Sequence, residues 1–178
     1  MVLPIDLFFL VLRVFAGLLI AGHGAQKVFG AFGGPGLEGF RTNVSKLGFA
    51  PRPFAELAAF GELVGGLAVA LGVLTPIAAA VLCVDMLVAI TKVHAPKGLW
   101  VTKGGYEFAL TLFVVFALFG LAGPGAIAID PRFELGRAIL AWSVPLFAVT
   151  FLLGALVVFA APQRRVAVPE KKRDEPAA

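Results

Sequence analysis

The sequence predicts an all-α, polytopic membrane protein whose chain crosses the bilayer five times. Of its 178 residues, 60% are apolar and only 15% are charged, whereas soluble domains are about 45 to 50% apolar and about 25% charged. Long apolar stretches recur along the chain, and most basic residues lie in alternate connections between them. We therefore do not expect a water-soluble globule, a disordered chain or a nucleic-acid-binding protein.

Five mostly apolar stretches approach the roughly 20 residues that cross a hydrocarbon core of about 30 Å. They cover residues 5–29, 54–74, 77–91, 106–121 and 138–161. Leu74 and Thr75 leave only a tight turn between the second and third stretches, and Pro76 suits the first turn of a helix because its missing N–H is not needed there. We expect these two helices to form an antiparallel hairpin.

The basic residues predict the orientation of the chain. Twelve of the fifteen Lys and Arg residues lie in the first and third connections, in their flanks, and in the C-terminal tail. Cytoplasmic loops retain positive charge during insertion, so these segments are expected in the cytoplasm and the N-terminus outside. That orientation requires an odd number of spans, which supports the fifth. The tail at 162–178, basic and poor in large apolar residues, is expected to be a disordered cytoplasmic extension.

Three ionisable residues lie near the middle of predicted spans, where a charge costs about 2.5 to 3.5 kcal/mol on insertion scales. They are Arg13, Glu62 and Asp85. Arg13 and Glu62 each share a helix face with small residues, which pack closely in lipid. We expect these faces to meet and the two side chains to pair across an axial offset of roughly 6 Å, with Asp85 nearby. The alternative is a pair that only fixes helix register.

A second group of ionisable residues lies toward the predicted cytoplasmic ends of the helices. It consists of His23, Lys27, Glu56, His94 and Glu107. Titratable histidines beside carboxylates could relay protons to a quinone-like molecule whose tail stays in lipid. This group is the candidate ligand-binding site, although His94 could instead be exposed in its loop.

The connection at 33–52 alternates large apolar residues with charged ones. This pattern is typical of an amphipathic helix that lies in the headgroup layer. Such a helix could form a lid over the candidate ligand-binding site.

No sequence pattern indicates an intrinsic cofactor. The two histidines lack the carboxylate spacing of helical metal sites, so no metal is expected. The glycines form no nucleotide-binding fingerprint, and Cys83, the single cysteine, has no partner for dithiol chemistry within the chain.

Four short patterns together resemble the DoxX family over about residues 5–131. They are Arg13 followed by His23, Gly24 and Lys27; Glu62 followed by Gly65, Gly66, Gly72 and Thr75; Gly105-Tyr106-Glu107; and a Gly-Pro-Gly followed by Ile129-Asp130. The resemblance implies a four-helix transmembrane bundle, to which this chain adds a fifth C-terminal helix and a basic tail. It also implies a bacterial or archaeal cell membrane and a relationship to DoxD, a membrane subunit of a thiosulfate:quinone oxidoreductase.

The resemblance and the titratable groups together favour a membrane component of a redox or oxidative-stress system. Such a protein would bind a quinone or similar lipophilic molecule and take electrons from a soluble redox enzyme at the cytoplasmic face. Two alternatives stay open: a small-solute permease or channel lined by Arg13, Glu62 and Asp85, and a membrane scaffold for soluble redox enzymes. The sequence leaves open whether the chain catalyses a reaction alone, and its oligomeric state.

Overall fold

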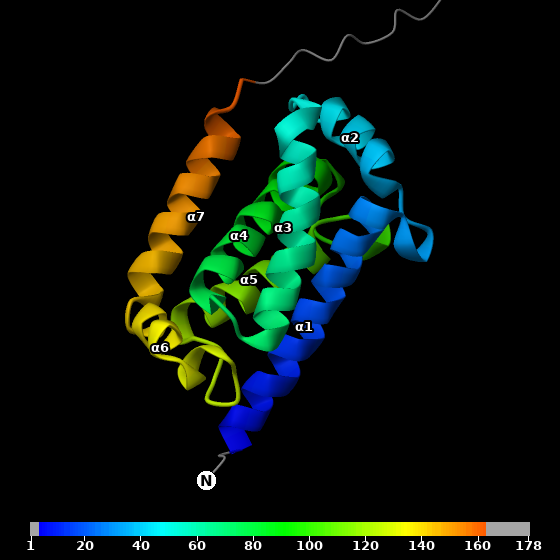
Figure 1. The fold of residues 1–178 in the computed structure, drawn as a ribbon. Coiled ribbons are helices and arrows are strands. Elements are labelled where there is room, and N and C mark those ends of the chain that lie inside the picture. Colours follow the sequence, from blue (N-terminus) through cyan, green and yellow to red (C-terminus); the bar gives the residue numbers. More distant parts are fainter. Residues whose placement is uncertain (1–3, 163–178) are drawn as a thin grey trace, which may run out of the picture.

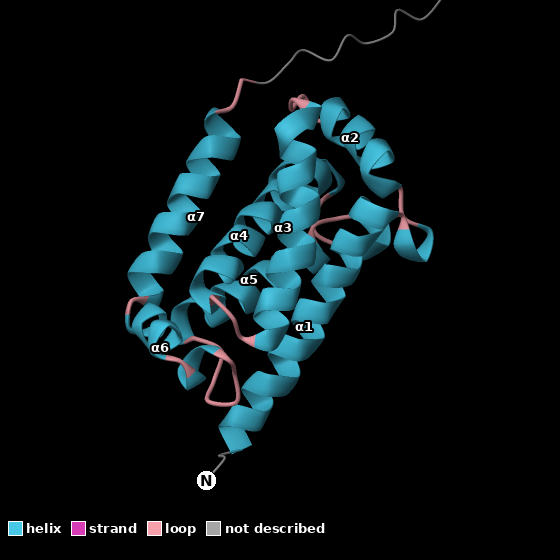
Figure 2. Ribbon diagram, in the orientation of Figure 1, coloured by secondary structure: helices cyan, strands magenta, loops and turns pink. Residues whose placement is uncertain are grey.

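The computed structural model describes residues 4–162, and their regular secondary structure is helical (Figure 2). Five longer helices form a bundle with a short helix at each end (Figure 1). The longer helices are α1 (Pro4–Phe29), α3 (Pro51–Leu71), α4 (Thr75–Val88), α5 (Glu107–Ala122) and α7 (Ser143–Ala160). The short ones are α2 (Gly36–Lys46) and α6 (Glu134–Ala141). The predicted tail at 162–178 lies almost wholly outside the described residues.

Four helical segments are long and apolar enough to cross a membrane: Pro4–Phe29, Arg52–Leu71, Thr75–Lys97 and Ser143–Ala160. Helix α5 is also apolar but has 16 residues, which rise about 24 Å. Helix α1 begins at one end of the bundle and α7 finishes at the other (Figure 1). The chain is therefore a multi-pass membrane protein, and the predicted all-α polytopic membrane bundle is confirmed.

The third apolar segment is longer than the predicted 77–91 because α4 does not stop at its last α-helical residue. It continues into a π-helical turn, Ala89–His94, and then a 3-10 turn, Ala95–Lys97. A π turn widens a helix locally and is frequent at functional sites. This one carries His94 to the end of the bundle that holds α2.

Helices α1 and α3 touch through their backbones, as their small-residue faces predict. A Cβ atom on Gly17 would meet the carbonyl oxygen of Gly66 at 2.6 Å, and a Cβ on Gly66 would meet that of Gly17 at the same distance. Farther along, Gly24 lies against the backbone of Leu63. These contacts set the register of the pair: α1 residues near Gly17 face α3 near Gly66, and the last turns of α1 face Glu62.

Asp130, which follows α5 in the chain, holds the tight turn between α3 and α4. Its carboxylate, 4% exposed, accepts hydrogen bonds from the backbone N–H of Leu74 at 2.8 Å and of Thr75 at 3.0 Å, and from the Thr75 hydroxyl at 2.9 Å. These N–H groups belong to the first turn of α4, where no intrahelical acceptor exists. Asp130 thus caps α4 and joins the α3–α4 hairpin to the loop after α5.

The last predicted span, 138–161, is divided in the structure between α6 and α7. Trp142 leaves helical geometry with φ −110° and ψ 21°, and the long membrane helix starts at Ser143. Helix α7 packs against α4, where Gly154 leaves room for Val84, and against α5. In Figure 1, α4 lies between α7 and α3, so α7 adds a second layer to the bundle of α1, α3, α4 and α5.

Candidate functional site

A cavity of about 880 Å³ opens inside the half of the bundle that carries α2. Its walls come from α1, α3, α4, α5 and α7, and α2 covers it with Phe40, Asn43 and Val44. This position of α2 agrees with the lid expected from the amphipathic pattern of 33–52. Most lining side chains are apolar, and only a few are polar or charged.

The charged part of the cavity wall is an ion pair between Lys27 of α1 and Glu62 of α3. Lys27 Nζ lies 2.6 Å from Glu62 Oε2, and the glutamate side chain is 3% exposed. Asp85 of α4 lies close enough to interact with both. The ammonium also rests 4.8 Å from the ring centre of Phe40. Two carboxyl groups therefore share one lysine in a largely apolar setting.

The expected pairing of Arg13 with Glu62 was wrong, although Glu62 and Asp85 do lie together. Arg13 instead donates hydrogen bonds to the carbonyl oxygens of Ala70, at 2.6 Å, and Ile127. Ala70 lies eight residues beyond Glu62, about 12 Å along the helix. The glycine contacts between α1 and α3 set the register of the two helices. In this register Arg13 lies level with Ala70, whereas Lys27 lies beside Glu62. Arg13, 3% exposed, ties α1 to α3 and to the loop after α5.

Both histidines of the predicted group line the cavity. The His23 ring lies over Phe108 with centroids 5.7 Å apart. His94, at the end of the π turn, has its Nδ1 atom 2.7 Å from the carbonyl oxygen of Gly104. That bond fixes the ring at the cavity wall, so His94 is half-buried there and is not a free loop residue.

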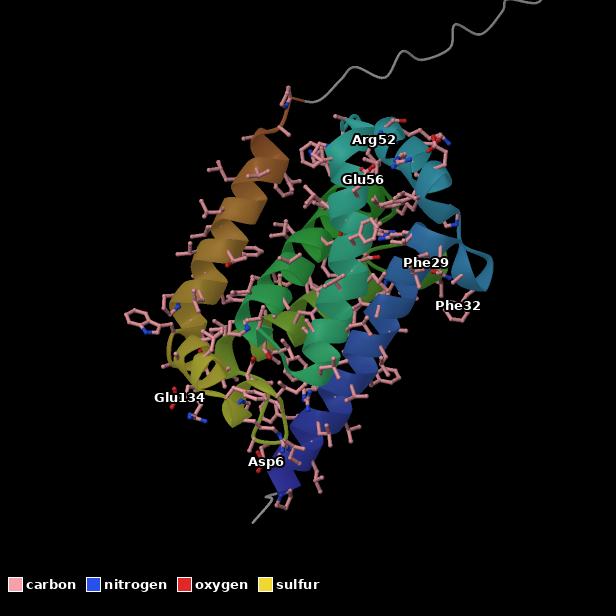
Figure 3. The ribbon with its side chains drawn as sticks, in the orientation of Figure 1. Asp6, Phe29, Phe32, Arg52, Glu56 and Glu134 are labelled. Atoms are coloured by element: carbon pink, nitrogen blue, oxygen red, sulfur yellow. The ribbon has the colours of Figure 1, made fainter. Side chains whose placement is uncertain are left out.

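Glu56 was predicted as part of the same site, but it is engaged at the outer end of α3. Its Oε1 atom accepts from Arg41 Nε at 2.9 Å and Nη2 at 2.7 Å, and Arg52 Nε lies 3.4 Å away. Figure 3 shows Arg52 and Glu56 together at this end. Hydrogen bonds to Glu38 and Glu56 raise the pKa of the Arg41 guanidinium. Glu56 therefore fastens α2 onto α3 and does not line the cavity.

Glu107, the other predicted carboxylate, also lies outside the cavity lining. Its Oε2 atom accepts a hydrogen bond from the backbone N–H of Val101 at 2.9 Å. This contact holds the loop before α5 against the first turn of that helix. Glu107 therefore stabilises the connection between α4 and α5.

Sequence reasoning missed two polar residues of the wall, Asn43 of α2 and Thr150 of α7. Asn43 belongs to the amphipathic segment, whose polar positions gave no sign of facing a cavity. Thr150 is one hydroxyl within a continuous apolar helix, and only the packing of α7 on α4 brings it to the site. Among residues 4–162, no three metal-ligating side chains cluster.

The model of the DoxX family matches residues 8–95 of this chain. The match includes α1, α2, α3 and α4 with its π turn, and thus Lys27, Glu62, Asp85 and His94. Helices α5 and α7, which complete the cavity, lie beyond it. No curated protein and no solved structure matches the chain.

Proposed function

Because residues 8–95 identify the chain as a DoxX-family membrane protein, we propose that it is the membrane component of a redox or oxidative-stress system. In this role it binds a quinone or a similar lipophilic molecule. The observation that supports this function is the cavity: about 880 Å³, mostly apolar, with Lys27, Glu62 and Asp85 on its wall. Small-molecule sites usually occupy about 300 to 1,000 Å³ and combine apolar walls with few polar groups.

The polar groups of the cavity are suited to bind both the oxidised quinone and the reduced quinol. A quinone carbonyl needs a hydrogen-bond donor, which Lys27 or a histidine provides, whereas the reduced quinol needs acceptors for its hydroxyl groups, which Glu62 and Asp85 provide. Ionisable side chains kept inside a membrane bundle usually serve a function, because their insertion is costly. The two histidines on the same wall, His23 and His94, add ring nitrogens that can donate or accept hydrogen bonds.

The proposed orientation places the α2 end of the bundle in the cytoplasm of a bacterial or archaeal cell. Basic residues gather at that end, among them Arg41, Lys46 and Arg52, and such residues favour the cytoplasmic side. A soluble redox enzyme docked there would supply electrons. Deletion of residues 162–178 should leave quinone binding intact even if it releases such a partner.

Titration of the purified protein with a naphthoquinone tests this function. Glu62→Gln and His23→Ala should weaken binding about tenfold or more, the amount expected for one lost polar contact of about 1.4 kcal/mol. Glu107→Gln is the matched control, because its carboxylate contacts the Val101 backbone and not the cavity. Equal binding by all four proteins, each shown to be folded by circular dichroism, would contradict the proposal.

The permease alternative has less support from the geometry. It needs Arg13 on the same path as Glu62 and Asp85, but the Arg13 guanidinium is bonded to backbone carbonyls toward the other end of the bundle. Solute flux through proteoliposomes that contain the wild-type protein separates this alternative from quinone binding.

A further inference from the structure

Several side chains that line the cavity are also exposed on the outside of the bundle, and these mark its mouth. Five of them lie on α3, α4 and α7 and are apolar, with exposed fractions of 38 to 58%. They are Leu57, Val81, Val149, Leu153 and Val157. In contrast, Glu62 is buried and Asp85 is partly buried. Between α3 and α7 the cavity is therefore apolar where it meets the outside and charged within, and its other exposed lining residues are Asn43 of α2 and Phe108 of α5.

This mouth lies between α3 and α7. Both helices pack against α4, which lies between them in Figure 1 and supplies the floor through Val81, Val84 and Asp85. Gly61 of α3 and Gly154 of α7 face this floor and add no side chain that would narrow the opening. Because outer surfaces of membrane-spanning helices face lipid, the mouth opens sideways into the bilayer.

At the end of the cavity toward α2, an apolar cluster packs beside the exposed lining residue Asn43. Val44, Phe49 and Ala55 are buried there, and Phe54 of α3 and Val158 of α7 pack against them. The rings of Phe49 and Phe54 lie 5.4 Å apart. On the α1–α5 side, Phe108 covers His23. A water-soluble ligand thus meets mostly apolar side chains at this end, whereas a lipid-dissolved ligand meets the apolar mouth between α3 and α7.

We propose that the ligand is a membrane amphiphile that enters from the bilayer between α3 and α7, with its polar head at Lys27, Glu62 and Asp85 and its hydrocarbon tail in the α3–α7 mouth. This inference rests on the proposed function and adds the entry route and the tail. It also assigns one wall of the ligand site to α7, which lies outside the part of the chain that matches the family model.

Two probes with the same head test the proposal: a naphthoquinone with an isoprenoid tail, and the same naphthoquinone carrying only a methyl group. Leu153 of α7 belongs to the mouth, and Ala58 of α3 lines the cavity next to the mouth residue Leu57. Leu153→Trp and Ala58→Phe should therefore each fill the opening. Each should weaken binding of the tailed probe about tenfold, because apolar contacts of several methylene groups are lost. Binding of the tailless probe should change less than about twofold, within ordinary context effects.

The matched controls are Leu152→Trp and Val64→Phe. Their positions are 64% and 60% exposed on the same two helices and do not line the cavity, so both probes should bind these variants like the wild type. If the mouth variants bind the tailed probe as well as the wild type does, the entry route is wrong while the quinone function stands. If the wild type binds neither probe, the function itself is wrong and the inference is lost with it.

Discussion

Lys27 is the residue whose removal should most disturb the charged wall of the cavity. Lys27→Met leaves Glu62 and Asp85 without their cation, and breaking a buried ion pair from one side typically costs about 3 to 5 kcal/mol. The double variant Lys27→Met, Glu62→Leu removes both charges of the ion pair. It should therefore lower the free energy of unfolding less than Lys27→Met alone does. Thermal unfolding in detergent measures this order. A double variant that is less stable than Lys27→Met would contradict the pairing.

Asp130 gives a second prediction for a single side chain. Asp130→Ala removes three hydrogen bonds at the start of α4, and loss of a cap costs about 1 to 2 kcal/mol. Asp130→Asn, which keeps an acceptor oxygen, should cost less. Chemical unfolding followed by circular dichroism provides the measurement, with exposed Glu134→Ala as the control (Figure 3). Equal stability of the alanine variants would show that the cap contributes nothing.

The sequence predicted that Arg13, Glu62 and Asp85 lie inside the bundle, but not which of them pair. Periodicity places Arg13, Lys27 and Glu62 on inward faces, since a face depends only on spacing along one helix. Pairing depends on how far one helix slides along the other. Here that register is set by the close contacts of Gly17 and Gly66, and no pattern within a single helix contains it.

Among the elements, the α1–α3 pair should be sensitive to added volume, because the two backbones touch. Gly17→Val introduces a side chain where a Cβ alone would lie 2.6 Å from the Gly66 carbonyl oxygen, and overpacking costs typically about 1 to 3 kcal/mol. Gly22→Val is the matched control on the same helix, because nothing lies within 4 Å of a Cβ there. Thermal unfolding of both variants checks the difference. Similar melting temperatures would mean that the helices do not touch as described.

Hydropathy predicted the order of the apolar helices, of which four are long enough to cross a membrane while α5 is shorter, but it missed two of their limits. The apolar stretch after Pro76 extends through a π turn to Lys97, and hydropathy alone cannot separate a π turn from an α-helix. The stretch at 138–161 is interrupted at Trp142. Trp142 is apolar and compatible with a helix, so only the packing of α6 against the loop around Asp130 reveals the break.

At the scale of the whole molecule, the proposed orientation predicts which end of the bundle faces outward. The test uses cells that express the protein with its native cysteine removed by Cys83→Ala. In that protein, the cysteine introduced by Glu134→Cys should react with a membrane-impermeant maleimide added outside the cells. A cysteine at Lys46, at the α2 end, should react only after the cells are opened. The reverse labelling pattern would place the α2 end outside and would remove the basis for a cytoplasmic redox partner.

If the charged cavity of the intact protein holds a quinone or similar lipophilic molecule, that molecule should co-purify with the protein. Mass spectrometry of small molecules that co-purify in mild detergent tests it without a chosen ligand. We expect a lipophilic quinone bound to the wild type and to Glu107→Gln, and at least about tenfold less on Glu62→Gln. The absence of any quinone, or the same amount on all three proteins, would contradict the proposed function.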